Sequence, residues 1–258
     1  MRRFLLASLA GVAVVGAGSA GAADLGVPYM KAPPPPPPAF SWTGCYIGTQ
    51  SGLGSGHTKW QDVGPLQAPG VGSIDSFGRG REAETDQTGA IFGGQIGCDY
   101  QFGQSFFGGP IVLGLQGQFS GSDINSTEID QFNPGWSLQN QIDWYGSITG
   151  RAGIAVDRFL PYVKGGVAWD HNKIEIENSG GTVGTPSITR TGWTIGGGLE
   201  WAFAPSWSVF FDTSYYDFSG QNVSFPGNGQ VATNPFTIRT KQTLETFTVG
   251  INWRFMGR

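Results

Sequence analysis

The stretch from Thr243 to Phe255 constrains the fold more than any other part of the chain. From Thr246 onward, small or polar residues alternate with the apolar residues Phe247, Val249, Ile251, Trp253 and Phe255. A period of two over this length means that one face meets an apolar medium and the other a polar one. About ten tilted residues cross an outer membrane, and aromatic residues collect at its interfaces. The stretch therefore predicts the closing strand of a transmembrane β-barrel, and its apolar residues are the candidate assembly signal.

The N-terminus has the pattern of a secretory signal peptide. Arg2 and Arg3 precede a run of roughly 15 apolar and small residues, Phe4 to Gly18, and Ala20-Gly21-Ala22 forms a small-x-small cleavage site. The alternative is an uncleaved anchor helix, but the run is shorter than the roughly 18 residues that a membrane helix needs. We expect residues 1–22 to be removed on export.

Six consecutive prolines, Pro33 to Pro38, follow the predicted cleavage site. Such a run forms a stiff, solvated polyproline II rod and cannot join a sheet ladder. We interpret residues 23–41 as a Pro-rich periplasmic spacer, with a docking peptide for a periplasmic partner as the alternative. The rest of the chain, 42–258, has the length of one all-β domain.

The composition suits the wall of a membrane barrel. The chain has 43 glycines, and only 13% of its residues are charged while 13% are aromatic. The lipid face of a barrel excludes charge, and a narrow lumen has room mainly for small side chains. A net charge of −4 without a basic patch argues against nucleic acid as a partner.

Eight segments after the proline run alternate between apolar and polar residues, and eight is the smallest strand number of membrane barrels. They lie at 43–53, 89–102, 111–121, 142–156, 161–171, 190–203, 207–218 and 243–255. Short connections alternate with long polar ones, which lie at 54–88, 122–141, 172–189 and 219–242. This alternation is typical of outer-membrane barrels. We predict an all-β fold, an eight-stranded antiparallel up-and-down transmembrane β-barrel with short periplasmic turns, long extracellular loops and both termini in the periplasm.

Within these segments, the charged residues lie on the face opposite the aromatic ones. In the segment 190–203, Trp193, Trp201 and Phe203 share one face and Glu200 lies on the other. An aromatic-rich face is too bulky for the interior of about eight strands, so we expect it to contact lipid. The ionisable residues predicted to face the lumen are Asp99, Asp143, Arg151, Lys164, Glu200, Asp212 and Arg254. We interpret them as ion pairs that fill and lock the interior; a charged constriction that selects small ions is the alternative.

Short motifs along nearly the whole chain resemble those of one known family. They are Ala23-Asp24-Leu25, the proline run, Trp42-Thr43-Gly44-Cys45-Tyr46-Ile47-Gly48, Gly93-Gly94-Gln95-Ile96-Gly97, Gly150-Arg151-Ala152-Gly153, Leu160-Pro161-Tyr162-Val163, Gly192-Trp193-Thr194 and the closing strand. Together they resemble the small, porin-like outer-membrane β-barrels of alphaproteobacteria of the RopB type.

The resemblance implies an abundant surface barrel that supports envelope integrity, with porin-like, haem-binding or adhesive roles in some relatives. The chain departs from the family pattern in three ways. It has Cys45 where the family favours an aromatic residue, and Gln116 and Gln118 where the family favours acidic residues. It also continues for Met256-Gly257-Arg258 beyond the aromatic residue on which the family usually ends.

The chain has no recognisable catalytic or cofactor motif. A hydrolase would need a His beside a Ser nucleophile, oriented by a carboxylate. His57 lies beside Ser55 but without an evident carboxylate in the local sequence, and His171 has no Ser nearby. Neither His has metal-ligand spacing, and the sequence contains no phosphate-loop or dinucleotide fingerprint. We predict that the protein is not an enzyme and binds no metal or other cofactor.

Two cysteines, Cys45 and Cys98, lie near the start of the first segment and near the end of the second. Both are on the predicted lipid-facing side, toward the periplasm. Pairing them would place Gly54 opposite Gly89, where the intervening loop begins and ends. The oxidising periplasm permits a disulfide, whereas a register displaced by two would leave two free cysteines that act as small apolar residues. The pair is a candidate disulfide, and both outcomes stay open.

These observations predict an integral outer-membrane barrel with a structural, surface-exposed role. One alternative is a low-conductance porin-like channel for small solutes. Another is a ligand-binding or adhesive protein, for example for haem, that uses aromatic residues of the loops: Trp60, Phe77, Phe132, Trp136 and Phe236. We expect outer-membrane lipids, lipopolysaccharide and the barrel assembly machinery as partners. The sequence leaves the oligomeric state open.

Overall fold

The computed structural model describes residues 40–62, 82–103, 109–129, 136–178, 181–225 and 236–255. These residues form the strands β1 (Gly44–Asp62), β2 (Glu82–Gln101), β3 (Ile111–Ile129), β4 (Trp136–Ile154), β5 (Phe159–Asn178), β6 (Gly181–Gly184), β7 (Ser187–Ala204), β8 (Trp207–Phe225) and β9 (Phe236–Phe255). The predicted signal peptide, the proline run, Phe77 and Phe132 lie outside the described residues. Nothing in the described ranges is a helix long and apolar enough to cross a membrane.

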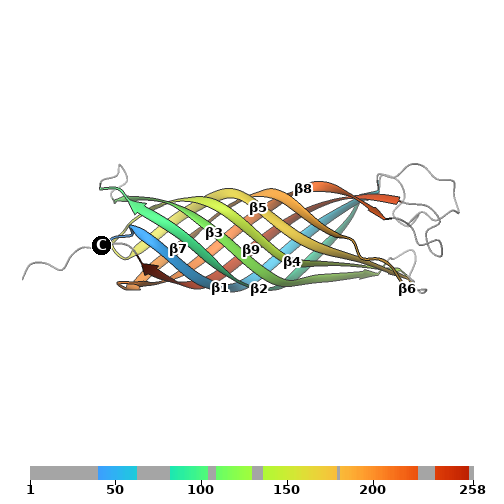
Figure 1. The fold of residues 1–258 in the computed structure, drawn as a ribbon, viewed down its shortest axis with the longest axis horizontal. Helices are drawn as coiled ribbons and strands as arrows, with labels where there is room; N and C mark the ends of the chain where they lie inside the picture. Colours follow the sequence, from blue (N-terminus) through green and yellow to red (C-terminus); the bar gives the residue numbers. More distant parts are fainter. Residues whose placement is uncertain are drawn as a thin grey trace, which may run out of the picture. The chain divides into compact units, whose positions relative to one another are not determined.

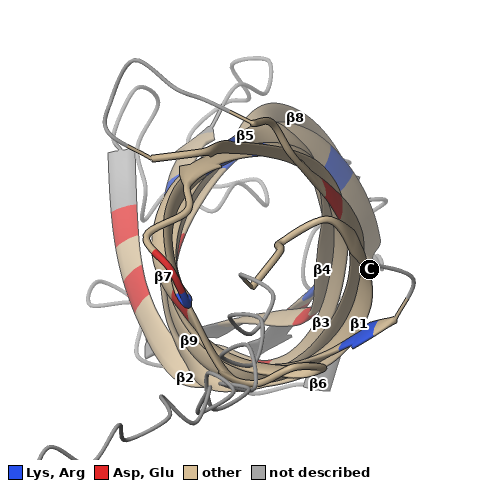
Figure 2. Cartoon of the chain, turned by 90° about the vertical axis from the view of Figure 1, so that its left-hand side faces the viewer, with Lys and Arg blue, Asp and Glu red and all other residues tan. Residues whose placement is uncertain are grey.

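The eight long strands close into an antiparallel barrel, which confirms the predicted fold class. Neighbours along the chain pair with each other, and β1 pairs with β9 to close the ring. The short β6 only adds an edge to β5. Figure 1 shows the strands inclined to the long axis of the barrel, and Figure 2 shows the closed ring. Because Cys45 pairs with Phe255, the start of β1 and the end of β9 lie at the same end of the barrel, here called the mouth.

The strands extend well beyond the segments that the sequence predicts. The sequence places the ends of the first hairpin at residues 53 and 89, whereas β1 runs to Asp62 and β2 begins at Glu82. Much of the predicted loop 54–88 is therefore a two-stranded ladder, and the other long connections are shortened in the same way. The prediction of the loop bounds was wrong because the outer face of these extensions is polar. The alternation of apolar and polar residues ends there, but the strands remain hydrogen-bonded to each other.

The outer face of the barrel changes from apolar to charged along the strands. On the side toward the mouth, large apolar side chains are exposed, among them Ile47, Leu53, Phe92, Ile96, Leu115, Phe119, Ile148, Val163, Trp193, Ile195, Phe247 and Ile251. Farther from the mouth, outward positions carry ion pairs such as Lys59–Glu84. An exposed apolar belt of this extent needs an apolar medium around it. The predicted facing of the strands is thus confirmed.

Side chains fill the interior of the barrel in layers. A buried apolar cluster at the mouth, here called the mouth plug, consists of Trp42, Val112, Ala155, Leu160, Tyr162 and Ala202. A second buried cluster, the central plug, consists of Ile91, Ile124, Ile142, Tyr145, Ala168, Tyr216, Phe218 and Leu244. These residues are at most 7% exposed. Such filling is expected because an eight-stranded interior is just wide enough for side chains.

The mouth plug depends on a turn of the chain just before β1. Gly44 has a φ of 142°, a conformation that residues with a side chain rarely adopt. Trp42 is fully buried behind this turn, and its indole Nε1 donates to the carbonyl of Asp157 at 3.3 Å. Its backbone N–H donates to Oε1 of Gln101 at 2.8 Å. The residue that precedes the first strand therefore helps to seal the barrel.

Candidate functional site: the buried ionic cluster

Six of the ionisable residues that the sequence assigns to the lumen are buried together beside the mouth plug. They are Asp99, Arg151, Lys164, Glu200, Asp212 and Arg254, and each is at most 8% exposed. They come from six different strands, and the inward alternation of each strand aims them at the barrel axis. Their three carboxylates and three cations cancel in formal charge. We call this set the ionic cluster.

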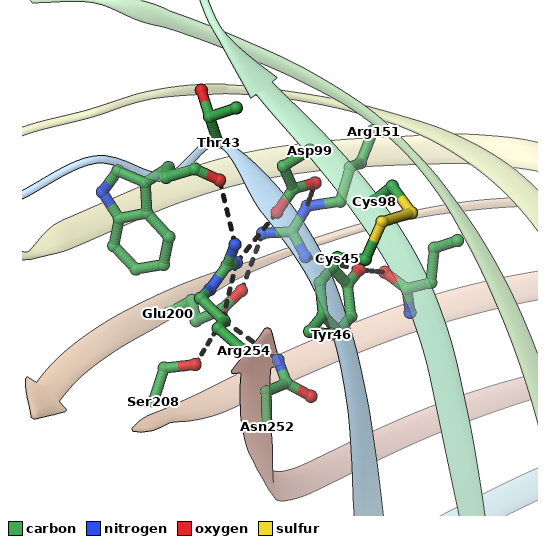
Figure 3. A network of polar contacts seen from close by, with 12 residues as sticks. Thr43, Cys45, Tyr46, Cys98, Asp99, Arg151, Glu200, Ser208, Asn252 and Arg254 are labelled. Carbon is green, nitrogen blue, oxygen red and sulfur yellow. Dashed lines mark hydrogen bonds and ion pairs between the residues drawn. A yellow bond between two sulfur atoms is a disulfide. The ribbon is translucent and has the colours of Figure 1, made fainter. Parts of the chain in front are cut away.

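Glu200 on β7 is the centre of the cluster (Figure 3). Its Oε2 accepts a hydrogen bond from Nη2 of Arg151 at 2.7 Å, and its Oε1 lies 3.1 Å from Nη2 of Arg254. The same Oε1 accepts from Oγ of Ser208 at 2.5 Å and from Nδ2 of Asn252 at 3.0 Å. Two guanidinium groups and two neutral donors therefore offset the cost of removing this carboxylate from water.

Asp99 on β2 connects the same two arginines from the opposite side. Its Oδ2 lies 2.8 Å from Nη2 of Arg254, and its Oδ1 lies 3.5 Å from Nε of Arg151. Both guanidinium groups also lie over aromatic rings: Arg254 is 4.7 Å from the Trp42 ring centroid, and Arg151 is 4.2 Å from that of Tyr162. In a site shielded from water, such cation–π contacts add to the stability of the arrangement.

Lys164 and Asp212 form the remaining ion pair of the cluster. Nζ of Lys164 lies 2.9 Å from Oδ1 of Asp212 and donates to Oε1 of Gln118 at 3.2 Å. The hydroxyl of Tyr162 donates to Oδ2 of Asp212 at 2.9 Å. Because the Tyr162 ring also contacts Arg151, this pair is continuous with the part of the cluster around Glu200.

A chain of amides borders the cluster on the side away from the mouth. The hydroxyl of Tyr46 donates to Oε1 of Gln116 at 3.2 Å, and Nε2 of Gln116 donates to Oε1 of Gln95 at 2.7 Å. Nε2 of Gln95 then donates to Oδ1 of Asn252 at 2.8 Å. Gln116 and Gln118 stand where the related family favours acidic residues. Their neutral amides keep the charges of the cluster balanced.

Glycines in the wall make room for the two tyrosines of this region. A Cβ atom at Gly97 would come within 2.5 Å of the Tyr46 hydroxyl, and one at Gly198 within 2.8 Å of the Tyr162 hydroxyl. Both distances are too short for real side chains, so these rings fit only against bare backbone. The high glycine content of the chain thus has a local structural reason at these positions.

Asp143 does not belong to the ionic cluster, and its predicted place in the lumen network was wrong. It pairs instead with Lys173 at 2.9 Å, and the Lys173 side chain is 60% exposed. The register of β4 against β5 shifts between Ile142 and Trp144. As a result, Ile142 and Tyr145 are both buried inside although they are three positions apart. A simple alternation cannot foresee such a bulge.

Sequence reasoning missed a second buried ion pair, which lies beyond the central plug. Nη2 of Arg190 is 3.1 Å from Oδ2 of Asp170, and both side chains are at most 1% exposed. Nη1 of Arg190 also donates to Oγ1 of Thr240 at 3.1 Å. Asp170 and Arg190 continue the even-numbered inward positions of Lys164 and Glu200. Following that alternation to the ends of the predicted strands would have found the pair.

The two histidines lie on the part of the barrel far from the mouth, and neither forms a nucleophile–base pair with a serine of the described ranges. Nδ1 of His57 contacts Oδ1 of Asp86 at 2.6 Å, a carboxylate partner on the neighbouring strand that the local sequence did not reveal. Its Nε2, which would have to receive the proton of Ser55, lies 3.8 Å from Glu84 instead. His171 contacts Thr189 through Nδ1 at 3.0 Å.

The described residues also lack a metal-binding cluster, because no three His, Cys, Asp or Glu side chains among them are grouped closely enough to hold an ion.

Cys45 and Cys98 are opposite each other in the β1–β2 ladder, and Gly54 is opposite Gly89, which confirms the predicted register. The structure joins the two cysteines in a disulfide across 53 positions of sequence. The predicted assembly residues also lie on the outer face, at the mouth end of β9: Phe247, Val249, Ile251, Trp253 and Phe255. Their part in assembly stays a prediction.

A family model described as outer membrane protein beta-barrel domain matches residues 10–255. The chain belongs to this family. Similar proteins include the 31 kDa outer-membrane immunogenic protein of Brucella melitensis biotype 1, which is 28% identical over 253 residues, or 96% of this chain and 98% of the relative. The 22 kDa outer membrane protein of Rhizobium leguminosarum bv. viciae is 28% identical over 187 residues, which cover 72% and 68% of the two chains.

Among solved structures, the outer membrane protein OprG from Pseudomonas aeruginosa matches with a TM-score of 0.45 and 11% identity, over 83% of this chain and 97% of that one.

Membership of the family confirms the resemblance to small alphaproteobacterial outer-membrane barrels. The protein is an integral protein of the cell outer membrane. The exposed apolar belt is therefore its lipid-facing surface, and the ion-paired ends of the long strands lie beyond the lipid. The end with the short turns and the mouth plug faces the periplasm, as small barrels of this kind are oriented.

Proposed function

We propose that this protein is a closed outer-membrane barrel that strengthens the envelope and presents long hairpins at the cell surface. The observation that supports a closed barrel is the filled interior, in which the mouth plug, the ionic cluster and the central plug follow one another along the axis. A permeating ion would have to leave water at two apolar layers, which is costly. The charges between these layers are satisfied by each other and leave no net charge to select an ion.

Planar-bilayer recording tests whether the plugs close the barrel. We expect the wild-type protein to show no conductance steps, whereas a triple variant in both plugs, Trp42→Ala, Tyr145→Ala and Tyr216→Ala, conducts. The matched control truncates outward side chains of the same types: Tyr100→Ala, Trp193→Ala and Tyr215→Ala. A shift in gel mobility on boiling verifies that each variant is folded. Steps from the wild type would favour the low-conductance channel, and a silent plug variant would show that these layers do not close the lumen.

The surface role rests on the height of the hairpins and on the names of the relatives. Several relatives are named outer-membrane immunogenic proteins. In this chain, β1 and β2 remain paired as far as Gln61 and Glu82, beyond the apolar belt. We infer that these hairpins are accessible from outside the cell.

Lysine labelling tests this orientation. Lys59, Lys173 and Lys241 lie on the external hairpins with side chains 49%, 60% and 53% exposed. Lys164 is buried in the ionic cluster, and Lys31 belongs to the segment expected in the periplasm. A membrane-impermeant amine reagent on intact cells should modify the first three residues and spare the other two. Lysed cells, in which Lys31 becomes reactive, are the control. Modification of Lys31 alone on intact cells would show that the barrel has the opposite orientation.

A further inference from the structure

A groove of about 500 Å³ lies on the outer face of the barrel, across the neighbouring strands β8, β9, β1 and β2. One row of its lining is apolar and contains Leu53, Ala90 and Phe247, which are adjacent across the strands. The next row, farther from the mouth, is polar and contains Ser55, Thr88 and Glu245. The groove thus combines an apolar floor with hydroxyl groups and one carboxylate.

The carboxylate of Glu245 differs from the described outward carboxylates of β2 and β8, the strands that flank β1 and β9. Those carboxylates have cationic or histidine partners: Glu84 with Lys59, Asp86 with His57, and Asp217 with Lys241. Glu245 is exposed and, within the described part of the chain, forms neither an ion pair nor a hydrogen bond through its side chain. A single negative charge is therefore available inside the groove.

The groove lies at the outer edge of the lipid-facing belt. Tyr215 pairs with Glu245 across β8 and β9, and the Tyr215 ring lies 5.7 Å from the ring of Trp193. Tyr and Trp gather where acyl chains meet head groups. Toward the mouth, Phe247 and Leu53 are exposed on the apolar side of this level. The polar row of the groove therefore faces head groups of the outer leaflet, and the apolar row faces acyl chains.

We propose that this groove binds an outer-leaflet lipid whose head group carries a positively charged amine. The amine pairs with the Glu245 carboxylate in a charge-assisted hydrogen bond, and the hydroxyls of Ser55 and Thr88 bind the remaining polar atoms of the head group. An acyl chain lies along Leu53 and Phe247. An anionic lipid without an amine is disfavoured because its charge faces Glu245. The proposal needs the membrane position of the barrel but not a closed lumen, so it can fail or hold independently of the proposed function.

Native mass spectrometry of the folded, full-length protein tests the proposal. The protein is released from detergent after incubation with phosphatidylethanolamine or with phosphatidylglycerol of the same acyl chains. We expect the wild type to retain phosphatidylethanolamine about fivefold better, the scale of one exposed ion pair. Glu245→Gln should lose this preference. Asp217→Asn is the matched control, because it removes a carboxylate of the same face outside the groove, and it should keep the preference.

A variant that fills the groove distinguishes the contribution of the apolar floor to lipid binding from that of the Glu245 charge. Ala90→Trp leaves Glu245 in place but occupies the groove, so it should lower retention of both lipids. Equal retention of the two lipids by the wild type, or an unchanged preference in Glu245→Gln, would overturn the proposal. Retention by Ala90→Trp at the wild-type level would overturn the groove as the site. If the wild type shows no lipid preference but forms dimers that Glu245→Gln abolishes, the occupant of the groove is a second copy of the protein. That result would also overturn the proposal.

Discussion

The part of the barrel inside the membrane and the part beyond it are built from the same strands but differ on their outer faces. Up to the level of Leu53 and Phe247, most of the large outward side chains are apolar. Beyond that level, the same strands carry outward ion pairs such as Lys241–Asp217. Inside the barrel, buried polar and apolar layers continue through both parts. The medium around the barrel therefore determines the outer positions, whereas packing across the lumen determines the inner ones.

The interiors of the two parts differ in how many partners support each buried charge. In the membrane part, Glu200 contacts Arg151, Arg254 and two neutral donors. In the external part, Asp170 forms one ion pair, with Arg190. Loss of a carboxylate leaves one uncompensated buried positive charge in either place, but at Glu200 it also removes the acceptor of four partners, so it should cost more there than at Asp170.

The largest expected effect comes from Glu200→Gln. This change leaves two buried guanidinium groups with only Asp99 as a counter-charge, and we expect the free energy of unfolding to fall by about 3–5 kcal/mol. Asp170→Asn should cost less, near the lower end of that range, because only one partner is lost and Arg190 keeps its bond to Thr240. Urea titrations of the protein folded into lipid vesicles measure both losses. Asp217→Asn on the outer face is the control, and an equal loss in all three variants would abolish the distinction between the two interiors.

Arginine substitutions along β9 should locate the change of medium on the outer face. Ile251 and Thr243 both point outward, but Ile251 lies within the apolar belt and Thr243 lies beyond Glu245. Ile251→Arg should lower the free energy of unfolding of the vesicle-inserted protein by about 2–4 kcal/mol, whereas Thr243→Arg should lower it by about 0–1 kcal/mol. The inward neighbour Asn252 is no mild control, because it is fully buried and bonded to Glu200. Equal losses at 251 and 243 would mean that the membrane boundary is placed wrongly.

Much of the membrane part could be predicted from the sequence because two alternations coincide there. Apolar outward residues such as Ile251 and charged inward residues such as Arg254 identify both faces at once. In the external part, both faces carry polar residues, for example Thr58 inside and Lys59 outside, so the sequence predicts a loop where the ends of β1 and β2 are paired. The bulge at Asp143 was also beyond prediction, because it depends on how β4 meets β5. The ion pair of Asp170 with Arg190, by contrast, was within reach of prediction, because both residues lie inside the predicted segments 161–171 and 190–203 and continue the inward alternation of Lys164 and Glu200.

Loss of the disulfide should weaken the membrane part by less than loss of the ionic cluster. Cys45 and Cys98 join β1 to β2 at the mouth, where the ladder already sets the register. We expect the double variant Cys45→Ser with Cys98→Ser to lose about 2–4 kcal/mol, mainly through a less constrained unfolded chain. Thiol counting on the unfolded, unreduced wild type should find no free thiol. Two free thiols would contradict the bond. As a control of the stability measurement, a reductant should leave the stability of the double variant unchanged.

The smallest expected effect is a pH dependence confined to the external hairpin of β1 and β2. A hydrogen bond from Lys59, and then its charge, holds the pKa of Glu84 below the ordinary value of 4.5. A carboxylate with a lowered pKa stabilises the folded hairpin above its unfolded pKa, and this contribution is lost as the pH falls through the folded pKa. Amide hydrogen exchange, corrected for its intrinsic rate, should therefore quicken at 82–88 below about pH 4.5 but not at 94–100 in the membrane part. Glu84→Gln should remove most of this pH dependence, because an amide does not titrate in that range. If exchange at 82–88 quickens at acid pH to the same extent in Glu84→Gln, other titrating groups cause the effect. The contact of Lys59 with Glu84 would then not stabilise the hairpin.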